Sequence, residues 1–288
     1  MLRNDAYKVS VAEEGALREY IRVKLITEIT KLPKEYFSAI DDAITASSFW
    51  TEPNTLDDID LLNTNTLGTP AADALQSSIQ NVFGDLGLDM DIIVSSHDTE
   101  DIENMTLHQG HPAYPNRWLV DGRWYISKQN PGRSTIDLEM LTAEEEIPDL
   151  DSAALVRHVA QTVRHELVHW NQMKKQAANK GGLTDTEAFE EMLNDPKQIP
   201  SGEESTVADY LRSHIEIDAH AHDAAEELLA VYGKNGAHDI LRGNVDLNDP
   251  KLPNALSHYY QVLPDDDSTI NKLNSKIYSY IEYLSEES

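Results

Sequence analysis

The sequence predicts an α+β fold, with a small block of strands between two groups of helices along the chain. Apolar residues recur at helical spacing before residue 50 and again after residue 150, whereas strand-like patterns are confined to residues 88–141. Helices and strands in separate blocks are typical of α+β proteins, because an alternating order would predict a parallel α/β sheet. The chain has 288 residues, of which 40% are apolar, enough for one large domain or two small ones.

Two helices are expected in the N-terminal part. Residues 11–48 carry apolar side chains at helical spacing, interrupted by Pro33, and residues 71–83 repeat the pattern after a polar segment. Because this polar segment has the composition of a loop, we expect an N-terminal helical part over residues 1–85 and the main domain over residues 86–288.

Three strand-like segments follow. Residues 88–96 have an apolar centre, and residues 133–141 alternate between apolar and polar side chains. Residues 116–127 predict a β-hairpin, because Asp121 and Gly122 suit a two-residue type I′ turn. We therefore expect these segments to form a small mixed sheet.

Two long helices are expected after the sheet. The first covers residues 152–179, where apolar side chains form one stripe, and the glycine pair at 181–182 ends it. A loop with a short helix then leads to the second long helix, expected over residues 205–232. The C-terminal segment from Ser268 also has helical periodicity.

Charge and composition exclude several classes of partner and site. The formal net charge of -28 repels phosphate backbones and anionic lipids, so neither nucleic acid nor a membrane is expected as a partner. The absence of cysteine excludes disulfides, thiol nucleophiles and cysteine metal sites. We expect no signal peptide and no transmembrane segment, because no stretch has the required apolar length. The sequence gives no indication of the oligomeric state.

The most informative segment is RHELVHW, at residues 164–170. His165 and His169 lie four residues apart, so both imidazoles of the expected helix can reach one ion. Neutral imidazole suits Zn²⁺. Glu166 is turned about 100° around the helix from His165, which places it beside such an ion as a proton acceptor. The alternative is a charged helix with two surface histidines.

A catalytic zinc ion takes three protein ligands and keeps an open position for water. Candidates for the third ligand lie on the second long helix, within residues 210–229: Glu216, His220, His214 and Asp218. Glu216 is the preferred candidate, and it shares one stripe of the helix with His220 and Asp223. The alternative for most of this run is a solvated polar face.

The HExxH motif, followed by a glutamate on a second helix, resembles the gluzincin metallopeptidases. The run from Tyr210 to Ala221 is also similar to small HExxH proteins of tailed phages. The resemblance implies a zincin-like fold, in which the small sheet packs on the motif helix and strand 133–141 is the edge strand that lines the cleft. It also implies a peptide or protein substrate and, for a phage-encoded protein, a place in the host cytoplasm or the virion.

The resemblance assigns a role to each matching residue. It makes His165, His169 and Glu216 the zinc ligands and Glu166 the general base. The implied reaction is hydrolysis of a peptide bond by metal-activated water, with Glu166 accepting the proton.

The sequence departs from the thermolysin pattern at His220, where an aspartate is usual four residues after the glutamate ligand. Asp218 or Asp223 is then the candidate to orient a histidine ligand. His220 itself is the preferred second donor to the oxyanion of the reaction. The alternatives for that donor are Tyr210, His222, Tyr259 and Tyr260.

Two other functions compete with the peptidase. One is a catalytically silent zincin fold that serves as a virion or interaction protein, with a structural zinc and four protein ligands. The intact Glu166 argues against it, because a structural site needs no base. The other is a binding module without metal.

Overall fold

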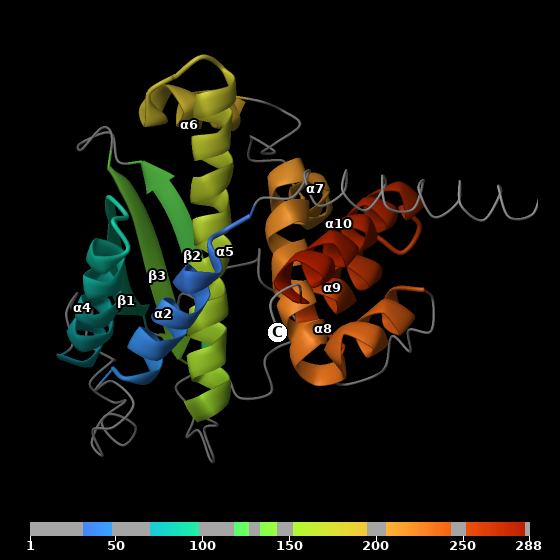
Figure 1. Cartoon of the computed structure of the whole chain (residues 1–288), viewed down its shortest axis with the longest axis horizontal. Helices are drawn as coiled ribbons and strands as arrows, with labels where there is room; N and C mark the ends of the chain where they lie inside the picture. Colours follow the sequence, from blue (N-terminus) through green and yellow to red (C-terminus); the bar gives the residue numbers. More distant parts are fainter. Residues whose placement is uncertain are drawn as a thin grey trace, which may run out of the picture. The chain divides into compact units, whose positions relative to one another are not determined.

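The structure is a mixed α+β fold, as expected, mostly helical and with one three-stranded sheet among the described residues (Figure 1). The computed structural model describes residues 31–47, 70–97, 118–126, 133–142, 152–194, 206–242 and 252–285. Contacts between Cα atoms divide the chain into two compact units, one of residues 31–219 and one that includes residues 220–288.

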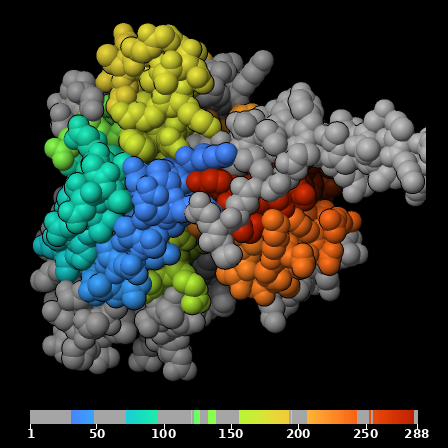
Figure 2. All heavy atoms as spheres, viewed as in Figure 1, coloured from blue at the N-terminus to red at the C-terminus, as the bar shows by residue number. Residues whose placement is uncertain are grey.

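In the first unit, helix α2 (Lys34–Thr45) follows a proline, and α4 (Pro70–Asp85) begins with one. Pro33 is the N-cap residue of α2. Pro70 occupies the first position of α4, where a proline has a suitable φ and lacks an N–H group that would have no helical partner. The helix expected over residues 71–83 is confirmed. The first part of the helix expected over residues 11–48 lies outside the described residues. Figure 2 shows the side chains of α2 and α4 side by side on one face.

The sheet has the strand order β1-β3-β2. β1 (Met90–His97) pairs parallel to β3 (Ser134–Thr142), and β2 (Trp118–Ile126) pairs antiparallel to β3. The expected mixed sheet is therefore confirmed, and the alternation predicted for β3 buries Ile136 and Leu138.

Two glutamines of α4 cover the outer edge of β1. Nε2 of Gln80 donates to the Met90 carbonyl at 2.8 Å, and Oε1 of Gln80 accepts from the Ile92 N–H at 3.0 Å. Oε1 of Gln76 accepts from the Val94 N–H at 3.0 Å. These side chains satisfy backbone groups that a further strand would otherwise pair with.

The long helix α5 spans Ser152–Asn179, which confirms the predicted bounds. Gly181 and Gly182 follow it with φ values of 87° and 85°, the left-handed conformation that glycine adopts at helix ends. The apolar stripe buries Val163 in a core shared with α2, α4 and the sheet. The short helix expected next is α6 (Asp185–Asn194).

The hairpin expected within residues 116–127 is wrong, because β2 runs through Asp121 and Gly122 without a turn. Gly122 lies opposite Leu138 in the register with β3. A glycine is required at this position because α5 packs closely against β2 here. A Cβ atom at position 122 would lie only 2.5 Å from Cγ2 of Thr162. A glycine inside a strand often marks such a close approach rather than a turn.

The expected edge position of strand 133–141 is also wrong, because β3 is paired on both sides. In the described sheet, the outer strand on the side away from β1 is β2. Alternation along a strand shows which face is buried, but it contains no information about which strands are neighbours.

Gly122→Ala should lower the free energy of unfolding by about 1–3 kcal/mol, because an added methyl group overpacks the contact between β2 and α5. Thr162→Ser removes the methyl group that a new Cβ would meet at 2.5 Å, so the double variant should lose less stability than Gly122→Ala alone. Gly84→Ala is the matched control, since nothing lies within 4 Å of a Cβ there. Urea unfolding measures all four proteins; equal stability of the Gly122→Ala and Gly84→Ala variants would contradict the explanation.

One apolar core joins α2, α4, the sheet and α5. Buried Arg164 of α5 also forms an ion pair with Asp41 of α2. The division into two units falls between Ala219 and His220, whereas the sequence suggested an N-terminal part of residues 1–85 and a domain of residues 86–288. The described segments on either side of residues 51–85 share the same core.

The helix expected over residues 205–232 is broken at Ser213. Helix α7 (Val207–Arg212) ends there and α8 (His214–Leu241) begins, because Ser213 has a ψ of 141° and is extended rather than helical. A second irregularity of α8 lies at Gly233, which has a φ of 64°.

In the second unit, the part of α8 from His220 onward is followed by α9 (Asn254–Val262) and α10 (Asp267–Ser285). α10 confirms the helix expected from Ser268, and it buries Ile277 and Tyr280. Among the helices in the described part of the chain, none is both long and apolar enough to cross a membrane.

Candidate metal centre

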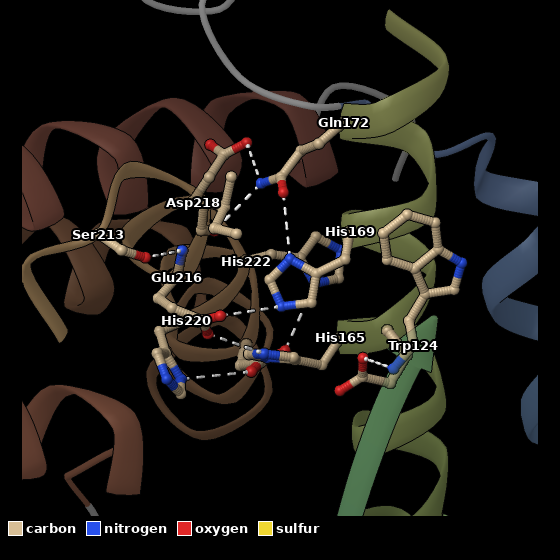
Figure 3. Close-up of polar contacts among 12 residues, drawn as sticks. Trp124, His165, His169, Gln172, Ser213, Glu216, Asp218, His220 and His222 are labelled. Atoms are coloured by element: carbon tan, nitrogen blue, oxygen red, sulfur yellow. Dashed lines mark hydrogen bonds and ion pairs between the residues drawn. The ribbon is translucent and has the colours of Figure 1, made fainter. Parts of the chain in front are cut away.

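Helix α5 presents His165 and His169 on one face. Their ring centroids lie 4.9 Å apart, as expected for side chains separated by one helical turn. One ligand atom from each of His165, Glu166 and His169 lies within 4.8 Å of the others. Figure 3 shows both rings directed from α5 toward Glu216. This part of the chain therefore contains a group of side chains that can hold a metal ion.

The break at Ser213 places Glu216 in the first turn of α8. Oγ of Ser213 accepts a hydrogen bond from the Glu216 N–H at 3.3 Å, as a residue that caps a helix start does. The N-terminus of a helix also carries a partial positive charge, which favours an ionised carboxylate nearby. The local sequence, Ser-x-x-Glu, thus explains both the helix start and the place of the carboxylate.

The Glu216 carboxylate spans the two imidazoles. Oε1 lies 3.5 Å from Nε2 of His169, and Oε2 lies 3.5 Å from Nε2 of His165. Both distances exceed the roughly 2.7–3.2 Å of an N–H···O hydrogen bond. Two ligands that each lie about 2.0–2.1 Å from one tetrahedral zinc ion are about 3.4 Å apart. The spacing of Glu216 from each histidine therefore matches that of two ligands of one zinc ion.

The three side chains are largely buried, with exposed fractions of 12% for His165 and 9% for both His169 and Glu216. Burial disfavours ionisation of Glu216, but the charges of His169 and His165 outweigh it and hold the pKa of Glu216 well below its usual range. Burial acts to lower the pKa of His169, and Glu216 raises it, with a net upward shift. The lowered pKa favours the ionised carboxylate, which is the form that binds a metal ion.

Glu166 lies beside the histidines and is held by the sheet. Its Oε2 accepts a hydrogen bond from the Trp124 N–H of β2 at 2.8 Å, and the residue is buried. The missing side chain of Gly122 permits this approach, because a Cβ there would lie 3.1 Å from Cγ of Glu166. The backbone of β2 therefore fixes one carboxylate oxygen of Glu166.

Gln172 contacts His169 from the side away from Glu216. Its Oε1 lies 3.1 Å from Nδ1 of His169, and its Nε2 donates to Oδ2 of Asp218 at 3.3 Å. Asp218 therefore reaches a histidine through Gln172, whereas the sequence suggested that Asp218 or Asp223 orients one directly.

His220 lies one turn after Glu216 on α8, on the stripe that the sequence predicts. Its ring packs edge-on against Tyr259, with centroids 5.6 Å apart. Its Nδ1 lies 3.9 Å from Oδ2 of Asp223.

The other candidate residues differ widely in exposure. His214 and Tyr210 are exposed, whereas His222 and Tyr259 are fully buried. Tyr260 is half-buried. His214, one of the candidates for the third ligand, is therefore an exposed residue in the first turn of α8.

Sequence reasoning missed three contributors to the site. Ser213 had a usable signal, because a serine three residues before Glu216 matches a capping pattern. Gln172 also had a usable sequence signal, because it follows His169 by three residues and so lies on the same face of the helix. The N–H of Trp124 had none, because every residue except proline carries this group.

Comparisons with models of known protein families, with well-characterised proteins and with solved structures give no match to this chain. The function is therefore inferred from the geometry of the candidate site.

Proposed function

We propose that this chain is a zinc-dependent metallopeptidase, with His165, His169 and Glu216 as zinc ligands and Glu166 as the general base. The observation that carries the proposal is the position of the Glu216 carboxylate, each oxygen of which lies 3.5 Å from a histidine Nε2 atom. Two imidazoles and one carboxylate form a ligand set of catalytic zinc sites, which keep a fourth position open.

A zincin-like fold is part of this proposal. It is supported by a small sheet that packs on α5 and by a later helix, α8, that supplies the carboxylate. Glu166, the proposed base, accepts a hydrogen bond from the backbone of β2. We therefore place an extended peptide substrate along β2 and not along residues 133–141.

The reaction that follows is hydrolysis of a peptide bond. When bound, the zinc ion would act as a Lewis acid that lowers the pKa of water and polarises the substrate carbonyl. Glu166 accepts a proton from the attacking water and passes it to the leaving amine. The Trp124 N–H holds one oxygen of Glu166 during these transfers. His220, one turn beyond Glu216, is the proposed second donor to the oxyanion.

Purified protein should contain about one zinc ion per chain by elemental analysis. The double variant His165→Ala, His169→Ala should lose this zinc, because two of three ligands are removed. His214→Ala is the matched control, since it removes an exposed histidine from the first turn of α8 and should keep the zinc. Full zinc content in the double variant would rule out the site. A structural zinc in a silent protein would instead give full zinc content without cleavage of any peptide.

A further inference from the structure

The side-chain amide of Gln172 connects the two segments that carry the candidate ligands (Figure 3). Its Oε1 lies 3.1 Å from Nδ1 of His169 on α5. Its Nε2 donates to the Ile215 carbonyl at 3.1 Å and to Oδ2 of Asp218 at 3.3 Å, both at the start of α8. Ile215 and Asp218 lie on either side of Glu216 in the sequence.

The orientation of this amide follows from its neighbours. The NH₂ group faces a carbonyl and a carboxylate, which both accept hydrogen bonds. The reverse orientation would place the amide oxygen against these two acceptors and leave both without this donor. Oε1 therefore faces His169, and Nδ1 must carry a proton to donate to it. In the neutral ring, Nε2 then has the lone pair, and Nε2 is the atom that faces Glu216.

We propose that Gln172 is a positioning residue, which selects the metal-binding tautomer of His169 and holds the Glu216 segment beside it. The consequence for zinc rests on the proposed function. Without Gln172, the ring can place its proton on Nε2 and block that ligand atom. Asp218 is 3% exposed, so little water competes with the amide of Gln172 for its Oδ2 atom.

Gln172→Met keeps the side-chain length and removes both the donor and the acceptor. It should lower zinc affinity about 10–100-fold, the usual cost of losing a partner behind a metal ligand. The double variant Gln172→Glu, Asp218→Asn should restore most of the affinity, because the introduced asparagine amide can donate to the introduced carboxylate, which accepts from Nδ1 of His169. Gln176→Met is the matched control, one turn further along α5, where the amide bonds to the exposed Glu191.

Competition with a chelating dye gives the zinc affinities of these variants. Wild-type affinity in the Gln172→Met variant would overturn the positioning role, and so would an equal loss in the Gln176→Met control.

A second measurement separates this inference from the proposed function. In metal-free Glu216→Ala protein at about pH 9, where imidazoles are neutral, long-range proton–nitrogen NMR should place the His169 proton on Nδ1. Adding Gln172→Met should move that proton toward Nε2, and loss of the signal in a His169→Ala variant assigns it. An unchanged tautomer would overturn the role of Gln172 even if zinc binds. A wild-type protein without zinc would contradict the proposed function, while the tautomer would still decide the role of Gln172.

Discussion

Glu166→Gln should keep the protein folded and zinc bound while it lowers the rate of peptide hydrolysis by roughly 10²–10⁴. Glutamine does not accept a proton from water, but its oxygen still accepts the hydrogen bond that the Trp124 N–H donates to Glu166 at 2.8 Å. The substitution therefore separates proton transfer from positioning. Elemental analysis measures the zinc, and cleavage of a peptide library measures the rate.

The matched control is Glu190→Gln, which changes the net charge by the same amount at an exposed position of α6 and should retain full activity. Loss of zinc from the Glu166→Gln variant would make Glu166 a ligand. The geometry allows Glu166 to bind the same ion, because one of its carboxylate oxygens lies within 4.8 Å of a ligand atom of each histidine. Unchanged hydrolysis would remove Glu166 as the base, and no cleavage by the wild type would favour the silent protein.

The histidine half of the candidate site could be predicted from sequence because it is local. The apolar stripe and the glycines at 181–182 define α5 without reference to the rest of the chain. Within a helix, the four-residue spacing of His165 and His169 fixes their shared face. The same local logic predicted α4, β1 and α10 close to their observed bounds.

The parts that could not be predicted depend on contacts between distant segments. Gly122 suits a turn when only its neighbours are considered, whereas the structure uses it to bring β2 against α5. The edge assignment of β3 failed for the same reason, because strand order is decided by pairing across the sheet. The break at Ser213 is the exception: it was local and visible as a capping pattern, but the helical periodicity of the whole run concealed it.

Glu216→Ala should reduce zinc affinity by more than the 10–100-fold that loss of an outer partner typically costs, because it removes a ligand itself. Glu216→Gln should have a similar effect, and it keeps the side-chain volume in a buried site, so a cavity is not the cause. His214→Ala is the control from the same helical turn and should bind zinc normally, since its side chain is exposed. Dye competition measures these affinities, and wild-type affinity in both Glu216 variants would contradict the assignment.

His220 is the competitor for the third ligand, because it follows Glu216 by one turn on α8. The two assignments differ in the atoms around the ion and in the effect of His220→Ala. With Glu216 as ligand, X-ray absorption of the zinc-loaded protein should show two histidines, one carboxylate and one water. His220→Ala should then keep zinc and lower hydrolysis, since a donor to the oxyanion is lost. If X-ray absorption instead shows three histidines and a water, and the His220→Ala variant loses zinc, then His220 is the third ligand. Glu216 would then lie outside the set of atoms that bind the ion.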